Sequence, residues 1–201
     1  MSKVTRWEGK YLRMVTDDGW EYVERCGGMT AVVIVAMHDG KFILVEQMRV
    51  PLGERRCIEL PAGLVGDEDD KGVEATALKE LEEETGFIAL RVERLGEFFS
   101  SPGMVAEGYT LVRAHGVRPG GTKIEDDIVV HLVAPGEVAG FIAAKRTEGL
   151  AIETKLLLVL AGDLLNCWVV EAGGGSSMPP LPPVQLCPYS DANNQICGRW
   201  T

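Results

Sequence analysis

The segment that most constrains this chain is residues 79–87, KELEEETGF. Read as a helix that ends at Gly86, it places Glu80, Glu83 and Glu84 on one arc of roughly 100°. Glu82 points nearly the opposite way, towards solvent. Like charges three and four residues apart on a helix repel one another, so the cluster requires an explanation. A solvated acidic face is one; a hard divalent cation with oxygen ligands, such as Mg²⁺, is the other.

The composition is that of a globular chain without a nucleic-acid partner. It has 201 residues, 46% of them hydrophobic, which is enough for one domain with a buried core. A net charge of −10 argues against binding to a phosphate backbone. Five scattered cysteines without a CxxC pair suit neither a disulfide framework nor a zinc site. No apolar run has the length of a signal or membrane segment, so we expect no membrane partner and a cytoplasmic location.

Alternating and continuous apolar runs predict strands along most of the chain. Residues 3–25 predict an antiparallel β-ribbon, because Asp18-Gly19 between two alternating runs is a strong hairpin signal. Nearly continuous apolar runs are typical of strands buried on both faces. Together these patterns predict strands at 31–36, 41–47, 57–60, 90–99, 108–115 and 127–134.

Three helices and three regions complete the expected organisation. Helices are predicted over 73–85, with Gly86 as a left-handed cap, and over 135–145 and 150–166. The chain divides into the ribbon at 1–27, a main domain at 28–171 and a tail at 172–201. That tail combines Gly-Ser and Met-Pro-Pro-Leu-Pro-Pro stretches, which form no packed core and which we expect to be mostly disordered. A proline-rich segment that binds a partner is the alternative for the tail.

Gly63 followed by the 79–87 helix resembles the signature of the Nudix hydrolases, a glycine, a glutamate and then Arg-Glu-apolar-any-Glu-Glu-any-Gly-apolar. The second half matches with one exchange, Lys79 for arginine. The first half departs, because the spacing from Gly63 to Glu80 is two residues longer and the acidic run 67–70 replaces the first glutamate. The resemblance covers roughly residues 5–167.

Within that family, four flanking features resemble the ADP-ribose pyrophosphatase group. They are the segment 46–49 (EQMR), the segment 58–63 (IELPAG), the turn 101–103 (SPG) with Pro102, and the late acidic loop before 128–131 (IVVH). The resemblance implies an α/β (α+β) Nudix fold, with mixed β-sheets sandwiched between helices and an N-terminal antiparallel β-ribbon. It also implies hydrolysis of ADP-ribose, or of a closely related nucleoside diphosphate sugar, to AMP and ribose 5-phosphate.

The same resemblance implies roles for individual residues. Glu80, Glu83 and Glu84, with the backbone carbonyl of Ala62, would hold Mg²⁺, for which Mn²⁺ is a possible substitute. Glu83 and Glu84 would also act in catalysis, and a further carboxylate from the late loop, Glu125 or Asp126, would assist as base or as an extra ligand. Asp127 lies close behind them, and an exposed turn is the alternative for this loop.

Substrate contacts are expected at five residues outside the helix. Arg49 would contact the diphosphate, and Glu59 would either bond substrate hydroxyls or brace its loop. Pro102 lies about where that group has its marker proline, and a plain turn is its alternative. Tyr11 and Trp20 would stack on adenine in a site completed by the partner subunit of a homodimer, and a cross-strand aromatic pair is their alternative. His131 is expected to be structural, and Cys26 and Cys57 to be buried small hydrophobes.

Two other functions remain open at the level of sequence. The first is a Nudix hydrolase with another nucleotide diphosphate substrate, which would share the same metal site. The second is a non-catalytic Nudix domain that senses ADP-ribose. Such domains commonly lose signature carboxylates, whereas this chain keeps all three on the helix.

Overall fold

The computed structural model describes residues 2–66, 72–121, 124 and 126–157. The chain divides into two compact units, Met1–Cys167 and Trp168–Thr201, and all of the described residues belong to the first. The predicted tail at 172–201 and residues 158–166 of the last predicted helix lie outside the described residues. No described helix is both long enough and apolar enough to traverse a lipid bilayer.

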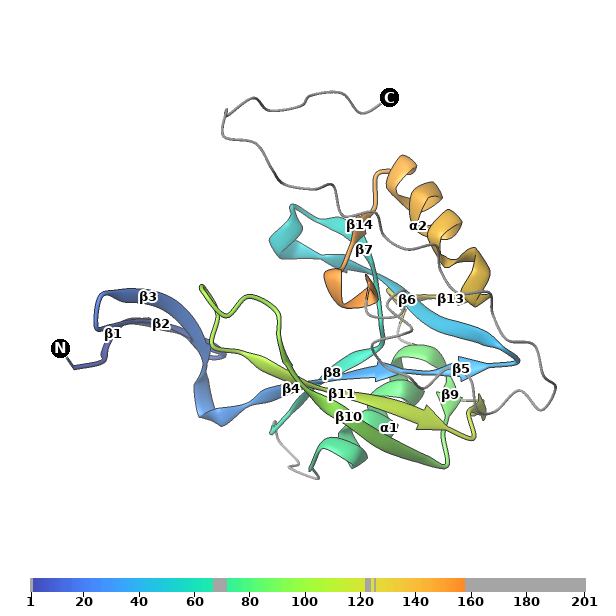
Figure 1. Cartoon of the computed structure of the whole chain (residues 1–201), viewed down its shortest axis with the longest axis horizontal. Helices are drawn as coiled ribbons and strands as arrows, with labels where there is room; N and C mark the ends of the chain where they lie inside the picture. Colours follow the sequence, from blue (N-terminus) through green and yellow to red (C-terminus); the bar gives the residue numbers. More distant parts are fainter. Residues whose placement is uncertain (1, 67–71, 122–123, 125, 158–201) are drawn as a thin grey trace, which may run out of the picture. The chain divides into compact units, whose positions relative to one another are not determined.

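The N-terminal ribbon forms its own three-stranded antiparallel sheet, in the order β1-β2-β3 (Figure 1). Its strands are β1 (Val4–Glu8), β2 (Leu12–Asp17) and β3 (Trp20–Arg25). Asp18 and Gly19 both have positive φ, 45° and 87°, as the two-residue turn of a hairpin requires. The predicted hairpin is therefore confirmed, and β1 adds a third strand to it.

A four-stranded mixed sheet follows, in the order β10-β11-β4-β8. It consists of β4 (Thr30–Val35), β8 (Ala62–Val65), β10 (Arg91–Phe99) and β11 (Gly108–His115). β4 runs parallel to β11 and antiparallel to β8, with Val32 opposite Gly63. The last four residues of β4 are buried, which agrees with its continuous apolar sequence. β8 is not among the strands predicted from the sequence.

The second large sheet has the order β13-β6-β7-β14, and β5 pairs with β6. Its strands are β5 (Met37–His38), β6 (Lys41–Arg49), β7 (Arg55–Glu59), β13 (Val129–Val133) and β14 (Ala151–Ile152). A further pair, β9 (Phe87–Ile88) with β12 (Arg118–Pro119), is antiparallel. The short 3₁₀ turns are η1 (Cys26–Gly28), η2 (Val50–Leu52), η3 (Pro135–Glu137) and η4 (Thr154–Leu156).

Helix α1 (Gly72–Thr85) carries the acidic segment and packs against β8, β4 and β10 (Figure 1). Val73, Ala77 and Leu81 recur every fourth residue, so they share one helix face. All three belong to a buried cluster with residues of β4, β6, β8 and β11. Gly86 has φ of 71° and its N–H bonds to Glu82 O, which ends the helix in the predicted left-handed cap.

Helix α2 (Val138–Thr147) confirms the helix predicted at 135–145, with η3 as its first turn. The helix predicted at 150–166 is wrong in its first half. Ala151 and Ile152 form β14, which pairs in parallel with Cys57 and Ile58 of β7, and η4 follows. Ala151 and Ile152 therefore extend a sheet whose neighbouring strand lies far away in the sequence.

A nearly buried glutamate ties the second sheet to α2. Glu46 is 8% exposed, and its carboxylate accepts hydrogen bonds from Arg56 Nε at 2.7 Å and His131 Nε2 at 2.9 Å. Lys145 of α2 lies 3.5 Å from the same carboxylate. Burial raises the pKa of Glu46, but the bonds from Arg56 and His131 outweigh it, so the pKa lies below its ordinary value. His131 thus contacts a structural ion pair, as expected.

We expect Glu46→Gln to lower the free energy of unfolding by about 3 kcal/mol at neutral pH, because it removes the buried anion that Arg56, His131 and Lys145 share. Since the pKa of Glu46 is lowered on folding, its ionised form stabilises the chain above the ordinary glutamate range. That contribution is lost as the pH falls through this range. Urea unfolding at several pH values should therefore show the two proteins converging in acid.

Glu74→Gln is the matched control. Glu74 pairs with Arg94 at 2.6 Å, but both side chains are about half exposed (51% and 54%), and exposed pairs contribute little. Equal unfolding midpoints for Glu46→Gln and Glu74→Gln would contradict a structural role for the Glu46 network.

Candidate metal and diphosphate site

Glu84 is the carboxylate of α1 that reaches furthest into the fold. Its residue is 7% exposed, and its Oε2 accepts a hydrogen bond of 3.0 Å from the backbone N–H of Ala62. Ala62 begins β8, so this bond joins the end of α1 to the edge strand of the four-stranded sheet β10-β11-β4-β8. The fold thus brings Ala62 next to Glu84, two of the residues expected to hold a metal.

Gly63 leaves room for the Glu80 side chain, which lies directly over it. A Cβ atom at Gly63 would fall 2.2 Å from both Cγ and Cδ of Glu80, so any side chain there would displace Glu80 from this position. The glycine therefore lets a carboxylate approach the backbone of β8. This explains, in physical terms, why a glycine precedes the acidic helix in the sequence.

Two carboxylates consequently meet beside β8 in a poorly solvated place. The pKa of Glu84 is raised to about 7, chiefly by burial and also by the charges of Glu80 and Glu59, against the opposing effects of the Ala62 N–H and Arg49. Like charges in such surroundings are unfavourable unless a cation joins them. Carboxylate and carbonyl oxygens are the ligands that hard divalent cations take, so the donor set fits such a cation.

Glu83 lies apart from this pair. Its carboxylate is 3.4 Å from Lys79 Nζ, one turn earlier on the helix, and its side chain is 41% exposed. In the described part of the chain, no three histidine, cysteine, aspartate or glutamate side chains are gathered closely enough to hold a metal. The structure therefore brings Glu80 and Glu84 together and leaves Glu83 on the neighbouring surface.

Arg49 is held by a two-point ion pair. Its Nε and Nη2 donate to the two carboxylate oxygens of Glu59 at 2.7 and 2.5 Å, the fork geometry that arginine favours with carboxylates. These bonds, together with the charge of Glu84, raise the pKa of Arg49. Glu59 is 5% exposed, so it fixes the direction of Arg49 from inside the fold.

A cavity of about 570 Å³ opens beside these groups. Ala62 and Gly63 form part of its wall, and its charged lining residues are Arg25, Arg49, Glu59, Glu107, Glu153 and Lys155. The volume suits a small organic ligand. The cavity joins the two large sheets to the 100–109 segment, since Ser100 and Tyr109 also line it.

Four of these charged residues were not anticipated from the sequence. Arg25 and Glu107 form an ion pair of 2.5 Å although they lie 82 residues apart. Glu153 and Lys155 were assigned to a helix, on which residues two positions apart do not share a face. No local pattern marks any of the four, because only the folded chain places them on one cavity.

Other predicted residues lie elsewhere. Tyr11 and Trp20 are 44% and 63% exposed on the ribbon, and Pro102 is exposed in a turn. None of the three borders the cavity as it is formed by the described residues. Asp126 is exposed, Asp127 pairs with Arg56 at 3.2 Å, and residue 125 lies outside the described part. Their functional roles, like those of the helix carboxylates, stay predictions.

Of the two cysteines expected to be buried, Cys57 is buried and Cys26 is not fully so. Cys57 is 3% exposed, as expected of a small hydrophobe, and burial raises its pKa to about 12. Cys26 is only partly buried.

Comparison with known proteins defines the class. The NUDIX domain family model matches residues 28–146 of this chain, so the chain belongs to the Nudix family. A solved structure described as "Crystal structure of ADP compounds hydrolase" superposes with a TM-score of 0.54 over 70% of this chain and 81% of the other, at 19% identity. The predicted fold class is therefore confirmed.

The chain is also similar in sequence to several curated proteins. The "ADP-ribose pyrophosphatase" of Bacillus subtilis (strain 168) is 46% identical over 78 residues, which are 38% of this chain and 40% of that protein. The chain thus matches less than half the length of that relative. The "Methanol dehydrogenase activator" of Bacillus methanolicus is 34% identical over 153 residues, 69% of this chain and 79% of that protein.

We expect Glu84→Gln to stabilise the metal-free protein above neutral pH. The pKa of Glu84 is raised from 4.5 to about 7 in the folded chain, so ionising it disfavours the fold on the order of 2–3 kcal/mol. This penalty is absent below the unfolded pKa, grows between the two values and is complete above the folded one. Thermal unfolding in a chelator should show a higher Tm for the variant at pH 8 and equal values at pH 4.

Glu82→Gln, on the other side of the same helix turn, is the control and should show no such pH-dependent gain. If the Tm of Glu84→Gln fell below that of wild type by the same amount at pH 8 and at pH 4, the proposed repulsion between the Glu80 and Glu84 carboxylates would be refuted.

Proposed function

We propose that this chain hydrolyses the diphosphate bond of ADP-ribose, or of a closely related nucleoside diphosphate sugar, in a reaction that depends on a divalent cation. The names of its relatives support this substrate class. Besides the Bacillus protein, an "ADP-ribose pyrophosphatase" of Saccharomyces cerevisiae is 35% identical over 88 residues, and an "ADP-sugar pyrophosphatase" of Mus musculus is 51% identical over 51 residues. A cytoplasmic location belongs to the same proposal.

One observation carries the proposal. The Glu80 and Glu84 carboxylates converge beside Ala62 and Gly63, and these two residues form a wall of the cavity that Arg49 also lines. A cation held on the carboxylate side and a guanidinium on the other would flank a diphosphate. Both are the usual partners of phosphate oxygens.

Mg²⁺, or Mn²⁺ in its place, would be held by Glu80, Glu83, Glu84 and the carbonyl oxygen of Ala62. When bound, the cation would neutralise the diphosphate, lower the pKa of an attacking water and stabilise the leaving phosphate. Glu83 would join the site by leaving its exposed ion pair with Lys79, which is a small loss for a surface pair.

The remaining steps fall to side chains of this chain. Arg49, held by Glu59, would orient the diphosphate for in-line attack. A carboxylate of the late loop, Glu125 or Asp126, would take a proton from the attacking water. The water oxygen then bonds to one phosphorus, the P–O bond to the bridging oxygen breaks, and AMP and ribose 5-phosphate leave.

The adenine end would be bound by the ribbon. Six large apolar side chains of the ribbon are exposed by 39–63%: Val4, Trp7, Tyr11, Leu12, Met14 and Trp20. Such a concentration of exposed apolar surface is unusual for a chain that works alone. We propose that the ribbon pairs with a second copy in a homodimer, and that Tyr11 and Trp20 stack on the adenine bound by the partner subunit.

A panel of nucleoside diphosphate compounds with Mg²⁺ or Mn²⁺ tests the activity, with AMP release as the signal. We expect ADP-ribose to be cleaved, and we expect Glu80→Gln, Glu83→Gln and Glu84→Gln each to lower kcat/KM by roughly 100-fold or more, since even indirect partners of metal ligands matter by 10–100-fold. Glu82→Gln is the matched control on the same helix and should remain within a few-fold of wild type.

Retained metal-dependent AMP release by Glu83→Gln would remove that residue from the site. Efficient cleavage of a different nucleotide diphosphate, with ADP-ribose left intact, would show that the same metal site acts on another substrate.

Replacing Trp20 tests the adenine end separately. We expect Trp20→Ala to raise KM for ADP-ribose by about 10-fold, because base stacking on an aromatic ring stabilises a complex by about 1–3 kcal/mol. Leu90→Ala is the control, since Leu90 is 76% exposed but lies outside the ribbon. Sedimentation of both variants would show whether the homodimer persists, and an unchanged KM for Trp20→Ala would exclude Trp20 from the site.

A second candidate function rests on the Bacillus methanolicus relative, of which this chain covers 79%. Its name describes an activator of another enzyme, so a role directed at a protein partner, through nucleotide binding or hydrolysis, is the alternative. A wild-type chain that binds ADP-ribose tightly but releases no AMP would favour such a binding function over the hydrolase.

A further inference from the structure

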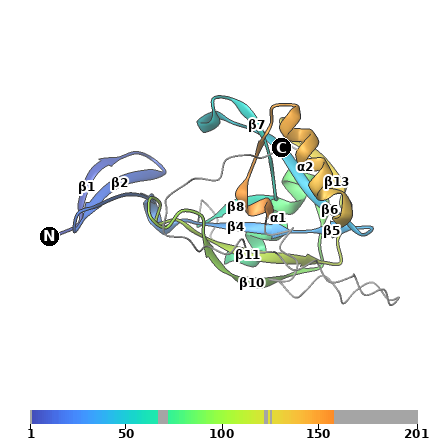
Figure 2. The same ribbon diagram turned by 45° about the horizontal axis from the view of Figure 1, so that its top comes forward.

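The segment after α2 is anchored firmly against β7. β14 pairs in parallel with β7, the N–H of Glu153 donates to Ile58 O at 3.0 Å, and Leu156 is completely buried. Figures 1 and 2 show this orange segment running back beside β7. Glu153 and Lys155 both line the 570 Å³ cavity, so a rigid turn presents them to a ligand.

The two side chains form an ion pair with unused bonding capacity. Oε1 of Glu153 pairs with Lys155 Nζ, whereas its Oε2 is buried and, within the described residues, accepts no hydrogen bond. A buried carboxylate oxygen without a donor is unfavourable and calls for an explanation. The Lys155 ammonium has three donors and lies 5.5 Å from the centre of the Tyr109 ring.

The charges around the cavity favour a neutral polar ligand at this end. Each lining cation already has a carboxylate partner: Arg25 with Glu107, Arg49 with Glu59, and Lys155 with Glu153. A phosphate placed against Glu153 would be repelled by that carboxylate. A hydroxyl group suits both members of the pair, because it donates to a carboxylate oxygen and accepts from an ammonium.

The sheet register separates this end from the carboxylates of α1. Tyr109 on β11 and Ala62 on β8 flank β4 on opposite sides, and their partners on β4, Ala31 and Val33, lie two residues apart, so the two positions are separated by about 12 Å. Apolar groups of Ala31, Cys57 and Ile152 line the cavity as well. A ligand whose diphosphate lies beside Ala62 and which extends across β4 would therefore place its sugar near Lys155.

We infer that Glu153 and Lys155 bind the hydroxyl groups of the sugar attached to the non-nucleoside phosphate, and thereby select nucleoside diphosphate sugars over nucleoside diphosphates without that sugar. This inference rests on the proposed function and deepens it by naming the residues that choose the substrate class. Burial lowers the pKa of Lys155, so contacts that stabilise its ammonium matter more here than at the surface.

Binding of two non-hydrolysable probes tests the pair without requiring turnover. The Kd values of α,β-methylene ADP-ribose and α,β-methylene ADP are measured by calorimetry with Mg²⁺, and their ratio isolates the contribution of the sugar. We expect wild type to prefer the sugar-bearing probe by at least about 10-fold, and Glu153→Gln and Lys155→Met each to remove most of this preference. Affinity for α,β-methylene ADP should change little.

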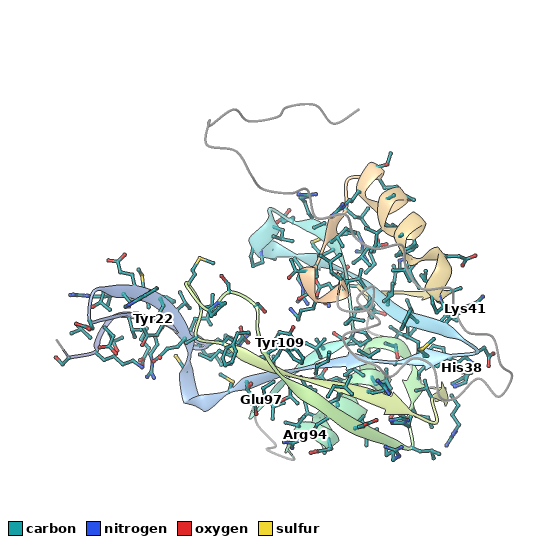
Figure 3. The ribbon with its side chains drawn as sticks, viewed as in Figure 1. Tyr22, His38, Lys41, Arg94, Glu97 and Tyr109 are labelled. Atoms are coloured by element: carbon teal, nitrogen blue, oxygen red, sulfur yellow. The ribbon has the colours of Figure 1, made fainter. Side chains whose placement is uncertain are left out.

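Lys41→Met and Glu97→Gln are the matched controls. They make the same chemical changes at exposed positions, at the start of β6 and on β10 (both residues are labelled in Figure 3). Glu97 pairs with Thr110, so its side chain lies on the face of the sheet opposite to that of Tyr109. Both should keep the wild-type ratio. Circular dichroism and Tm report whether each variant is folded, and the near-isosteric Glu153→Gln provides an independent test should Lys155→Met unfold.

Three results would overturn the inference: a wild-type ratio near one, an unchanged ratio in folded Glu153→Gln, or an equal loss of affinity for both probes. Hydrolysis is scored separately on ADP-ribose itself. A wild type that shows the sugar preference but releases no AMP would refute the proposed hydrolase and support the sugar contact. A wild type that cleaves ADP-ribose but binds the two probes with a Kd ratio near one would support the proposed hydrolase and refute the sugar contact.

Discussion

The burial of an ionisable carboxylate at the end of α1 is the constraint on which the site depends. Glu84 lies against the backbone N–H of Ala62, and Glu80 fills the space that a side chain at Gly63 would occupy. Two negative charges held this closely raise the free energy of the fold unless a cation compensates them. The helix, the edge strand β8 and the glycine are thus one unit, and none of them is explained without the others.

The other charged side chains that line the cavity are also held by partners of opposite charge. Arg49 is oriented by a two-point bond to a buried glutamate, and Arg25 and Lys155 each face a carboxylate of their own. Paired charges of this kind are already desolvated and positioned, so a ligand meets groups that need little reorganisation. The membership of the Nudix family and the polar cavity therefore point to one region of the molecule, between the two large sheets.

Local sequence signals predicted most of the scaffold because they act over a few residues. Alternating and continuous apolar runs located β4, β6, β10 and β11, and the Asp18-Gly19 turn located the ribbon hairpin. Gly86 marked the end of α1, since a left-handed cap favours glycine. The acidic face of α1 followed from its helical spacing, whereas the fold class followed from the resemblance of the acidic segment and its flanks to the Nudix hydrolases. β8 and β14 did not, because short strands depend on the partner strand more than on their own residues.

The sequence by itself determined the family signature, the helix that carries three carboxylates on one face, and the glycine that precedes it. Only the tertiary structure decided how these carboxylates differ: Glu84 is buried against β8, whereas Glu83 faces Lys79 at the surface. The tertiary structure also decided the conformation of residues 150–156. As a helix they would have pointed Glu153 and Lys155 to opposite sides, but pairing of β14 with β7 brings both to one cavity. That pairing is a contact between distant segments, so no local pattern contains it.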